Sequence, residues 1–93
     1  MSPDIEIRHD VAGRRFSAQV DGADCELDYV VESGVLTILH TGVPPQVGGR
    51  GIAAALTAAV AAYARAERLK VNPACSYASV YFRRHPEFSD LLA

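Results

Sequence analysis

Residues 43–56 read VPPQVGGRGIAAAL, a stretch that joins an extended segment to a helical one. The two prolines cannot donate hydrogen bonds to a β-ladder, so a strand must end at this point. Gly48, Gly49 and Gly51 then lead into an alanine-rich run. The first turn of a helix has unpaired N–H groups and a partial positive charge, and glycine lets an anion approach them closely. The stretch therefore fits a diphosphate-binding turn, or a flexible loop with a glycine cap.

Two common phosphate-binding motifs are excluded at this turn. The sequence has no Gly-Lys-Ser/Thr, which an ATPase P-loop requires. It also lacks GxGxxG, and the turn follows several extended segments instead of opening a βαβ unit, so a dinucleotide-binding fold is not expected.

The segments before the turn alternate between apolar and polar residues with a period of two. Such a pattern predicts strands with one face on a core and one face in water. Dipeptides that suit hairpin turns separate the segments, because glycine accepts positive φ; they are Ala12-Gly13, Asp21-Gly22 and Ser33-Gly34. We therefore expect four antiparallel strands in a meander, with apolar residues at Ile5 and Ile7; at Phe16, Ala18 and Val20; at Leu27, Tyr29 and Val31; and from Val35 to Val43.

After the turn the period becomes helical. From Ile52, the bulky residues Leu56, Val60 and Tyr63 recur on one side, with alanines between them, so this helix can lie close to a sheet. Residues 69–73 then form a short strand, and a right-handed crossover makes it roughly parallel to the fourth strand.

A second helix is expected at about residues 76–84, stopped by Pro86. We expect Val80 and either Tyr81 or Tyr77 to face inward. The predicted fold is mixed α+β: a four-stranded antiparallel meander, a helix, a short parallel fifth strand and a C-terminal helix.

Composition limits the kind of protein. The 93 residues are 49% hydrophobic and 22% charged, which predicts one compact domain over residues 1–93. A net charge of −2 makes nucleic acid an unexpected partner. No apolar run suits a membrane span and the N-terminus is too polar for a signal peptide, so we expect a cytoplasmic protein whose Cys25 and Cys75 are free thiols.

Residues 49–53 (GRGIA), between the fourth strand and the helix, resemble the acetyl-CoA motif Q/R-x-x-G-x-G/A of the GCN5-related N-acetyltransferases (GNATs). Gly51 and Ala53 fill the last two fixed positions of that motif. Gly48 occupies the first fixed position, where Gln or Arg is usual. This departure removes a side chain but keeps the backbone amides that make the contact. Residues 46–51 satisfy the same pattern in a shifted register.

The resemblance continues on both sides of the turn. Residues 40–44 (HTGVP) precede it, and residues 73–77 (PACSY) and 84–88 (RHPEF) follow it. Together these motifs are similar to a subfamily of very short bacterial-type acetyltransferases, over most of residues 35–92. The earlier strands match in pattern only.

The resemblance implies a site for acetyl-CoA as co-substrate. In the family, the fourth and fifth strands part at their C-terminal ends, the pantetheine arm pairs with the fourth strand, and the diphosphate lies on the amides of the glycine turn. The arginine of the turn would either add a charge-assisted contact or remain a solvated surface side chain. The residues expected to bind the co-substrate are Thr41, Val43, Gly48, Gly49, Arg50, Gly51, Ile52, Ala53 and Tyr81.

Acetyl transfer to an amine needs a neutral amine, a donor for the oxyanion and a proton for the departing thiolate. The family commonly meets these needs in turn with a base, with a backbone N–H of the fourth strand and with a tyrosine on the helix after the fifth strand. His40 is our candidate base, with a structural histidine as the alternative; Glu32 suits by type but lies at the wrong end of its strand. Tyr77 is our candidate proton donor, although either it or Tyr81 could reach the sulfur or pack in the core.

Cys75 is expected between the short strand and the second helix, close to the thioester. Helix N-termini favour the thiolate form that a nucleophile needs. The residue is therefore a nucleophile that first takes the acetyl group, a residue that lines the site during direct transfer, or a buried small thiol. Direct attack by the amine is the family norm and our preferred alternative.

We therefore expect an N-acetyltransferase that uses acetyl-CoA and a primary amine of a small molecule or peptide. The alternative is a non-catalytic acyl-CoA-binding module, or a subunit beside a partner protein. The shortness of the chain keeps this alternative open, since an acceptor pocket would be shallow or supplied by the partner.

Overall fold

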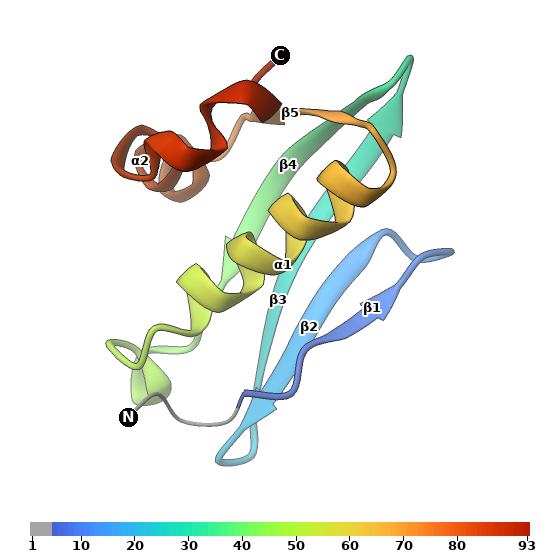
Figure 1. Ribbon diagram of the computed structural model, residues 1–93. Helices are drawn as coiled ribbons and strands as arrows, with labels where there is room; N and C mark the ends of the chain where they lie inside the picture. Colours follow the sequence, from blue (N-terminus) through green and yellow to red (C-terminus); the bar gives the residue numbers. More distant parts are fainter. Residues whose placement is uncertain (1–4) are drawn as a thin grey trace.

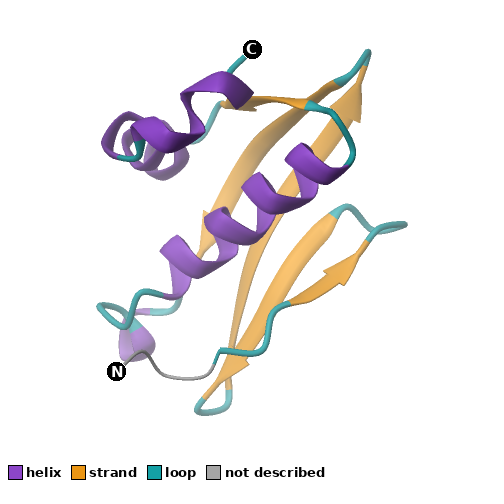
Figure 2. Ribbon diagram, in the orientation of Figure 1, coloured by secondary structure: helices purple, strands orange, loops and turns teal. Residues whose placement is uncertain are grey.

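The structure, a computed structural model, describes residues 5–93. Its sheet has the order β1-β2-β3-β4-β5, with β1 to β4 antiparallel and β5 parallel to β4 (Figures 1 and 2). The predicted α+β fold is confirmed. The elements are β1 (Arg8–Asp10), β2 (Arg15–Val20), β3 (Ala23–Glu32), β4 (Val35–Gly42), η1 (Pro45–Val47), α1 (Ile52–Ala66), β5 (Lys70–Pro73), α2 (Ser76–Arg84) and η2 (Pro86–Leu91).

Two hairpin turns use glycine as predicted. Asp21-Gly22 and Ser33-Gly34 have positive φ at both residues, the turn geometry that matches the twist of paired strands. The β1–β2 turn differs, because Arg14 has the positive φ of 55° and Gly13 does not. There the N–H of Gly13 donates to Asp10 Oδ1 at 2.9 Å, so a carboxylate stabilises the turn in place of glycine's conformational freedom.

The first strand also begins later than the alternation of apolar residues indicates. β1 covers only Arg8–Asp10, while Ile5 and Ile7 precede it and pack half-buried against the core. Apolar alternation reports which side chains are buried, and burial does not require a ladder partner.

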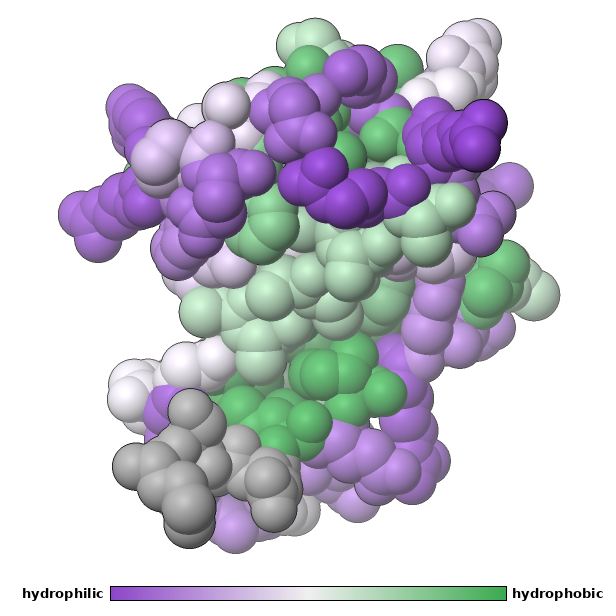
Figure 3. Space-filling model, viewed as in Figure 1, coloured by the Kyte–Doolittle hydropathy of each residue, from purple (hydrophilic) through white to green (hydrophobic). Residues whose placement is uncertain are grey.

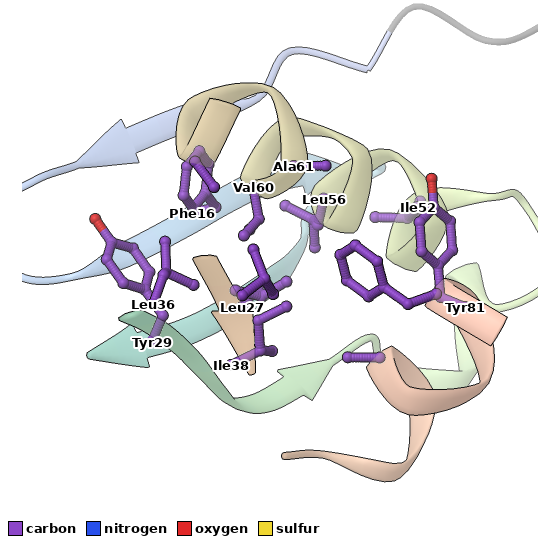
Figure 4. Packing of buried hydrophobic residues seen from close by; sticks show 14 of the residues in the cluster. Phe16, Leu27, Tyr29, Leu36, Ile38, Ile52, Leu56, Val60, Ala61 and Tyr81 are labelled. Carbon is purple, nitrogen blue, oxygen red and sulfur yellow. The ribbon is translucent and has the colours of Figure 1, made fainter. Parts of the chain in front are cut away.

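The core lies between one face of the sheet and the two helices (Figure 4). Along α1, Ile52, Leu56 and Val60 point toward the sheet, where Leu27 and Ile38 meet them. Ala61 and Ala64 of α1 are fully buried in this core. In Figure 1, α1 lies over this face of the sheet and runs roughly along the strands, and α2 lies toward β4 and β5.

In α2 the inward residues differ in part from the prediction. Tyr81 is buried, as expected, but Val80 is only half-buried and Tyr77 is 39% exposed. Ala78 and Phe82 take the other inward positions, because residues 78, 81 and 82 share one side of a helix.

β4 contains a β-bulge that decides which way its last residues face. Tyr29 lies opposite Ile38 and Asp28 lies opposite His40, so Leu39 is an extra residue that has no partner in β3. A bulge shifts the alternation of faces by one residue. Beyond it, Thr41 shares the helix-covered face with its partner in β3, Leu27. His40 shares the opposite face with Asp28, and we call this second side the open face.

Candidate active site

The candidate site begins where β4 and β5 part. The parallel ladder ends at the pair Ile38–Pro73, and the N–H of Cys75 then donates to the carbonyl of Ile38 at 3.2 Å. β4 continues to Gly42. The last residues of β4 therefore have β3 on one side and no ladder partner from β5 on the other.

The turn before α1 presents a set of unused backbone donors. None of the N–H groups of residues 49–53 donates to an acceptor in residues 5–93. The first hydrogen bond of the helix is from the N–H of Ala55 to the carbonyl of Gly51, at 3.0 Å. Val47 is buried and anchors the turn to the core. An anion at this helix start would meet several donors that are already in place.

Besides leaving the amides accessible, two glycines of the turn adopt a backbone conformation that the sequence did not reveal. Gly49 and Gly51 have φ of 80° and 78°, a region that residues with a side chain rarely adopt. A Cβ built on either would meet no atom within 4 Å, so crowding is not the reason for glycine. That open space is where a ligand on these amides would lie.

A shallow groove of about 420 Å³ runs from this turn along α1. Its floor is made of small side chains, and in Figure 3 they form the pale band of weakly hydrophobic surface across the middle of the molecule. Tyr81 of α2 borders the groove. The lining of the groove includes Arg50, Gly51, Ala54, Ala55 and Ala58. The sequence predicted a packing role for the alanines of this helix, and the structure shows that these three also line the groove.

Thr41 and Cys75 meet at the gap between the strands. Thr41 Oγ1 lies 3.6 Å from Cys75 Sγ, and the thiol also accepts a hydrogen bond from the N–H of Ala78 at 3.4 Å. Cys75 is the N-cap of α2 and is half-buried. The bulge brings this pair together, because Thr41 would otherwise face the other side of the sheet.

Tyr77 and Tyr81 lie on neighbouring turns of α2, with ring centroids 6.2 Å apart. Burial raises the pKa of both phenols above the usual 10.0, so both keep their protons at neutral pH. Tyr81 stacks on His85 with ring centroids 4.0 Å apart. In Figure 4 the Tyr81 ring lies beside Ile52, with its hydroxyl directed away from the core.

His40 lies on the open face, and its side chain is 61% exposed. Its Nε2 is 3.8 Å from Oε1 of Glu26 on β3. Sequence reasoning did not select Glu26, because the approach depends on the register of β3 against β4. Glu32, the second carboxylate considered, lies opposite Val35 at the far end of β4.

Arg50 pairs with Asp21 in the β2–β3 turn. The sequence offered phosphate contact or a solvated surface position for this side chain, and an ion pair across the surface is a third arrangement. Exposed ion pairs of this kind are weak, so the pair leaves the guanidinium able to turn toward an anion.

The residues predicted from sequence thus fall into two groups. Thr41 and Cys75 meet at the gap on the helix-covered side, with Tyr77 two residues further along α2, and the glycine turn lies at the start of the groove. His40 lies near the same gap but on the open face. The free amides, the open space over the glycines and the unpaired edge of β4 fit an elongated ligand that carries a phosphate group. No helix of residues 5–93 is long and apolar enough to span a membrane.

Comparison with known proteins adds an independent observation. A family model for GCN5-related N-acetyl-transferases matches residues 15–91. Protein NATD1 from Xenopus tropicalis is 34% identical over 89 residues, covering 91% of this chain and 81% of the relative. Protein NATD1 from Mus musculus is 31% identical over 85 residues, covering 88% and 77%.

A solved structure shares the fold. The solution structure of a GCN5-like candidate N-acetyltransferase from Staphylococcus aureus matches with a TM-score of 0.76 at 30% identity, covering 95% of this chain and 87% of that chain. The region matched by the family model runs from the start of β2 through η2, so it contains every site residue that the sequence predicted, whereas Ile5, which also lines the groove, precedes it.

Proposed function

The chain belongs to the GCN5-related N-acetyltransferase family, and from this premise we propose that it transfers the acetyl group of acetyl-CoA to a primary amine. The amine belongs to a small molecule or a peptide. The observation that carries the proposal is the row of unused N–H groups at residues 49–53, beside strands that have parted.

Binding of the co-substrate follows from that geometry. The amides of Gly49, Arg50, Gly51, Ile52 and Ala53 hold the diphosphate, aided by the partial positive charge of the start of α1. The free edge at the end of β4, from Thr41 to Gly42, and Val43 just after it pair with the pantetheine arm. Gly48 has no side chain, so the diphosphate can approach the backbone of the turn closely. Tyr81 borders the groove along α1.

The side chains at the gap then serve the transfer. The thioester supplies an activated acyl group. His40 takes a proton from the amine as its nitrogen bonds to the acyl carbon. As the carbon–sulfur bond breaks, Tyr77 gives its proton to the leaving thiolate, and its raised pKa ensures that the proton is present at neutral pH. A backbone N–H of β4 stabilises the oxyanion.

Cys75 lines the site in this direct mechanism. Its thiol already contacts Thr41 and the N–H of Ala78, which holds the side chain at the gap. The same position suits a nucleophile that carries the acetyl group first, and the two roles differ in whether the protein itself becomes acetylated.

A second candidate function is a non-catalytic acyl-CoA-binding module. The observation in its favour is the open face, which no helix among the described residues covers and where Leu39 is 50% exposed. A partner protein on that face would supply the missing wall of an acceptor site.

One experiment separates these functions. Calorimetry with CoA tests binding, and release of free thiol from acetyl-CoA in the presence of spermine, tyramine or a lysine peptide tests turnover. Binding with turnover supports the transferase, whereas binding without turnover supports the module. Absence of both binding and a thermal shift with saturating CoA would contradict both functions.

A further inference from the structure

The open face carries a close pair of titratable side chains over a glycine. Glu26 Oε1 and His40 Nε2 lie 3.8 Å apart. A Cβ added to Gly42 would lie 2.7 Å from that carboxylate oxygen and 3.0 Å from that ring nitrogen. Both side chains therefore lean over the bare Cα of Gly42, and glycine at this position leaves room for the pair.

The neighbouring carboxylate is engaged elsewhere. Asp28 lies directly opposite His40 in the ladder, but Arg15 holds it with two hydrogen bonds of 2.6 and 3.3 Å. Glu26 has no Lys or Arg partner within ion-pair distance among residues 5–93. Arg15 acts on Glu26 from farther away, and Arg8 lines the same hollow as Glu26. Within ion-pair distance among the described residues, the charged neighbour of Glu26 is His40 when its imidazole is protonated.

We propose that Glu26 is a positioning residue for His40, an inference that rests on the proposed function. Its carboxylate faces the Nε2 side of the ring, so that Nε2 keeps its proton and Nδ1 accepts the proton of the amine. The positive charge that forms on the imidazole is then balanced by Glu26. The proton later passes to solvent, which reaches this exposed face.

The geometry gives Glu26 a task that His40 cannot perform alone. At 3.8 Å the carboxylate lies beyond hydrogen-bond distance of this 61% exposed imidazole, so it acts on the ring through its charge and does not fix the ring in one orientation. A carboxylate on the Nε2 side favours the tautomer that carries its proton at Nε2 and balances the positive charge that forms as the base takes a proton, and general bases contribute roughly 10²–10⁴-fold to rate. The bulge at Leu39 makes this arrangement, since it places His40 and Glu26 on one face while Thr41 turns toward Cys75.

A double-mutant cycle tests the proposal. The variants are Glu26→Gln, His40→Asn and the double substitution, with Glu32→Gln as the matched control because it removes the same charge from the far end of β3. The most active amine among spermine, tyramine and a lysine peptide is the acceptor. We expect Glu26→Gln to lower kcat about tenfold, a part of the general-base effect, and to leave the Kd for CoA unchanged.

The decisive comparison is the double variant. If Glu26 acts through His40, then Glu26→Gln causes no further loss in the His40→Asn background. An equal loss in both backgrounds, or a Glu26→Gln protein as active as Glu32→Gln, would overturn the inference while leaving the proposed function intact. A wild-type protein that acetylates none of the amines would overturn the proposed function itself, and the inference with it.

Nitrogen-15 NMR of the His40 ring gives a readout that a purely structural role would not move. We expect the form protonated at Nε2 to predominate in the wild type and in Glu32→Gln, and to lose its excess in Glu26→Gln. The same tautomer ratio in all three proteins would count against Glu26 as the positioning group.

Discussion

Gly51 meets two requirements at one position. It is the N-cap of α1 and has a left-handed backbone with φ of 78°, and its lack of a side chain leaves open space over the turn. Glycine would be favoured by the positive φ alone or by the need for open space alone. The two reasons are separated by comparing this position with another glycine at which a substitution causes the same backbone strain. Gly34 allows this, since its φ is 77° and its Cβ position is also open, but it lies in the β3–β4 turn.

We expect Gly51→Asp to weaken CoA binding at least tenfold, which corresponds to about 1.4 kcal/mol. The new carboxylate would lie against the diphosphate and repel it. Gly34→Asp carries the same backbone strain and should leave the Kd unchanged. Calorimetry checks both, and equal affinities for Gly51→Asp and wild type would show that the diphosphate lies elsewhere.

Cys75 likewise joins a structural role to a chemical one. Its sulfur caps α2 by accepting from the N–H of Ala78, and it contacts Thr41 across the gap. Serine is a good N-cap and preserves the first role, while its hydroxyl is a much weaker nucleophile than a thiolate.

We expect Cys75→Ser to fold normally and to keep turnover within about tenfold of wild type, because direct attack by the amine does not require the thiol. Thiol-release kinetics give the rate. Mass spectrometry of the wild-type protein mixed with acetyl-CoA alone should show no acetyl group on Cys75, and buried Cys25 is the internal reference. A labile acetyl on Cys75 together with an inactive serine variant would establish the nucleophile instead.

At the scale of elements, α1 connects the core to the site. Its inward side is fully buried against the sheet, its first turn forms the glycine site, and its outward alanines line the groove. A helix with no side-chain cap at its N-terminus depends on such packing for its position.

We therefore expect Leu56→Ala to lower the free energy of unfolding by about 2–5 kcal/mol, the usual cost of a cavity at a fully buried leucine. Urea unfolding measures it. Ala62 is exposed on the same helix, and Ala62→Ser should change stability by less than about 0.5 kcal/mol. A small effect of Leu56→Ala would mean that α1 is not held by the core as described.

For the whole molecule, an aromatic cluster ties the first three strands to α1. His9 stacks on Phe16 with ring centroids 3.8 Å apart, its Nε2 lies 2.6 Å from the hydroxyl of Tyr29, and Tyr63 of α1 meets the ring edge-on at 4.4 Å. Burial lowers the pKa of His9 below 6.5, and nearby Asp10 opposes this in part.

This pKa shift has a definite consequence for stability. Below pH 6.5 the unfolded chain protonates His9 more readily than the folded protein does, so stability rises with pH in this range. The contribution is complete above pH 6.5 and is lost as pH falls through the folded pKa. We expect the free energy of unfolding to fall as the pH is lowered from 6.5 through the lower pKa of the folded protein, and to fall less in His9→Gln. Identical pH profiles for the two proteins would contradict the role of His9.

The sequence by itself determined the order of elements and the location of the glycine turn. Period-two alternation, two glycine hairpins and the prolines after Val43 predict the strands, and the spacing from Ile52 predicts the helix, because these signals are local. They also identify residues whose chemistry suits the site, such as Cys75, Tyr77 and His40.

Only the tertiary structure decided which of these residues meet, and on which face of the sheet. The bulge at Leu39 sends Thr41 toward Cys75 and His40 toward Glu26, and no local pattern in β4 announces it. The pairing of Glu26 with His40 and of Arg50 with Asp21 depends on contacts between distant segments. Local backbone preference fixes what an element is, whereas strand register fixes what its side chains contact, and register is settled only when the whole sheet packs.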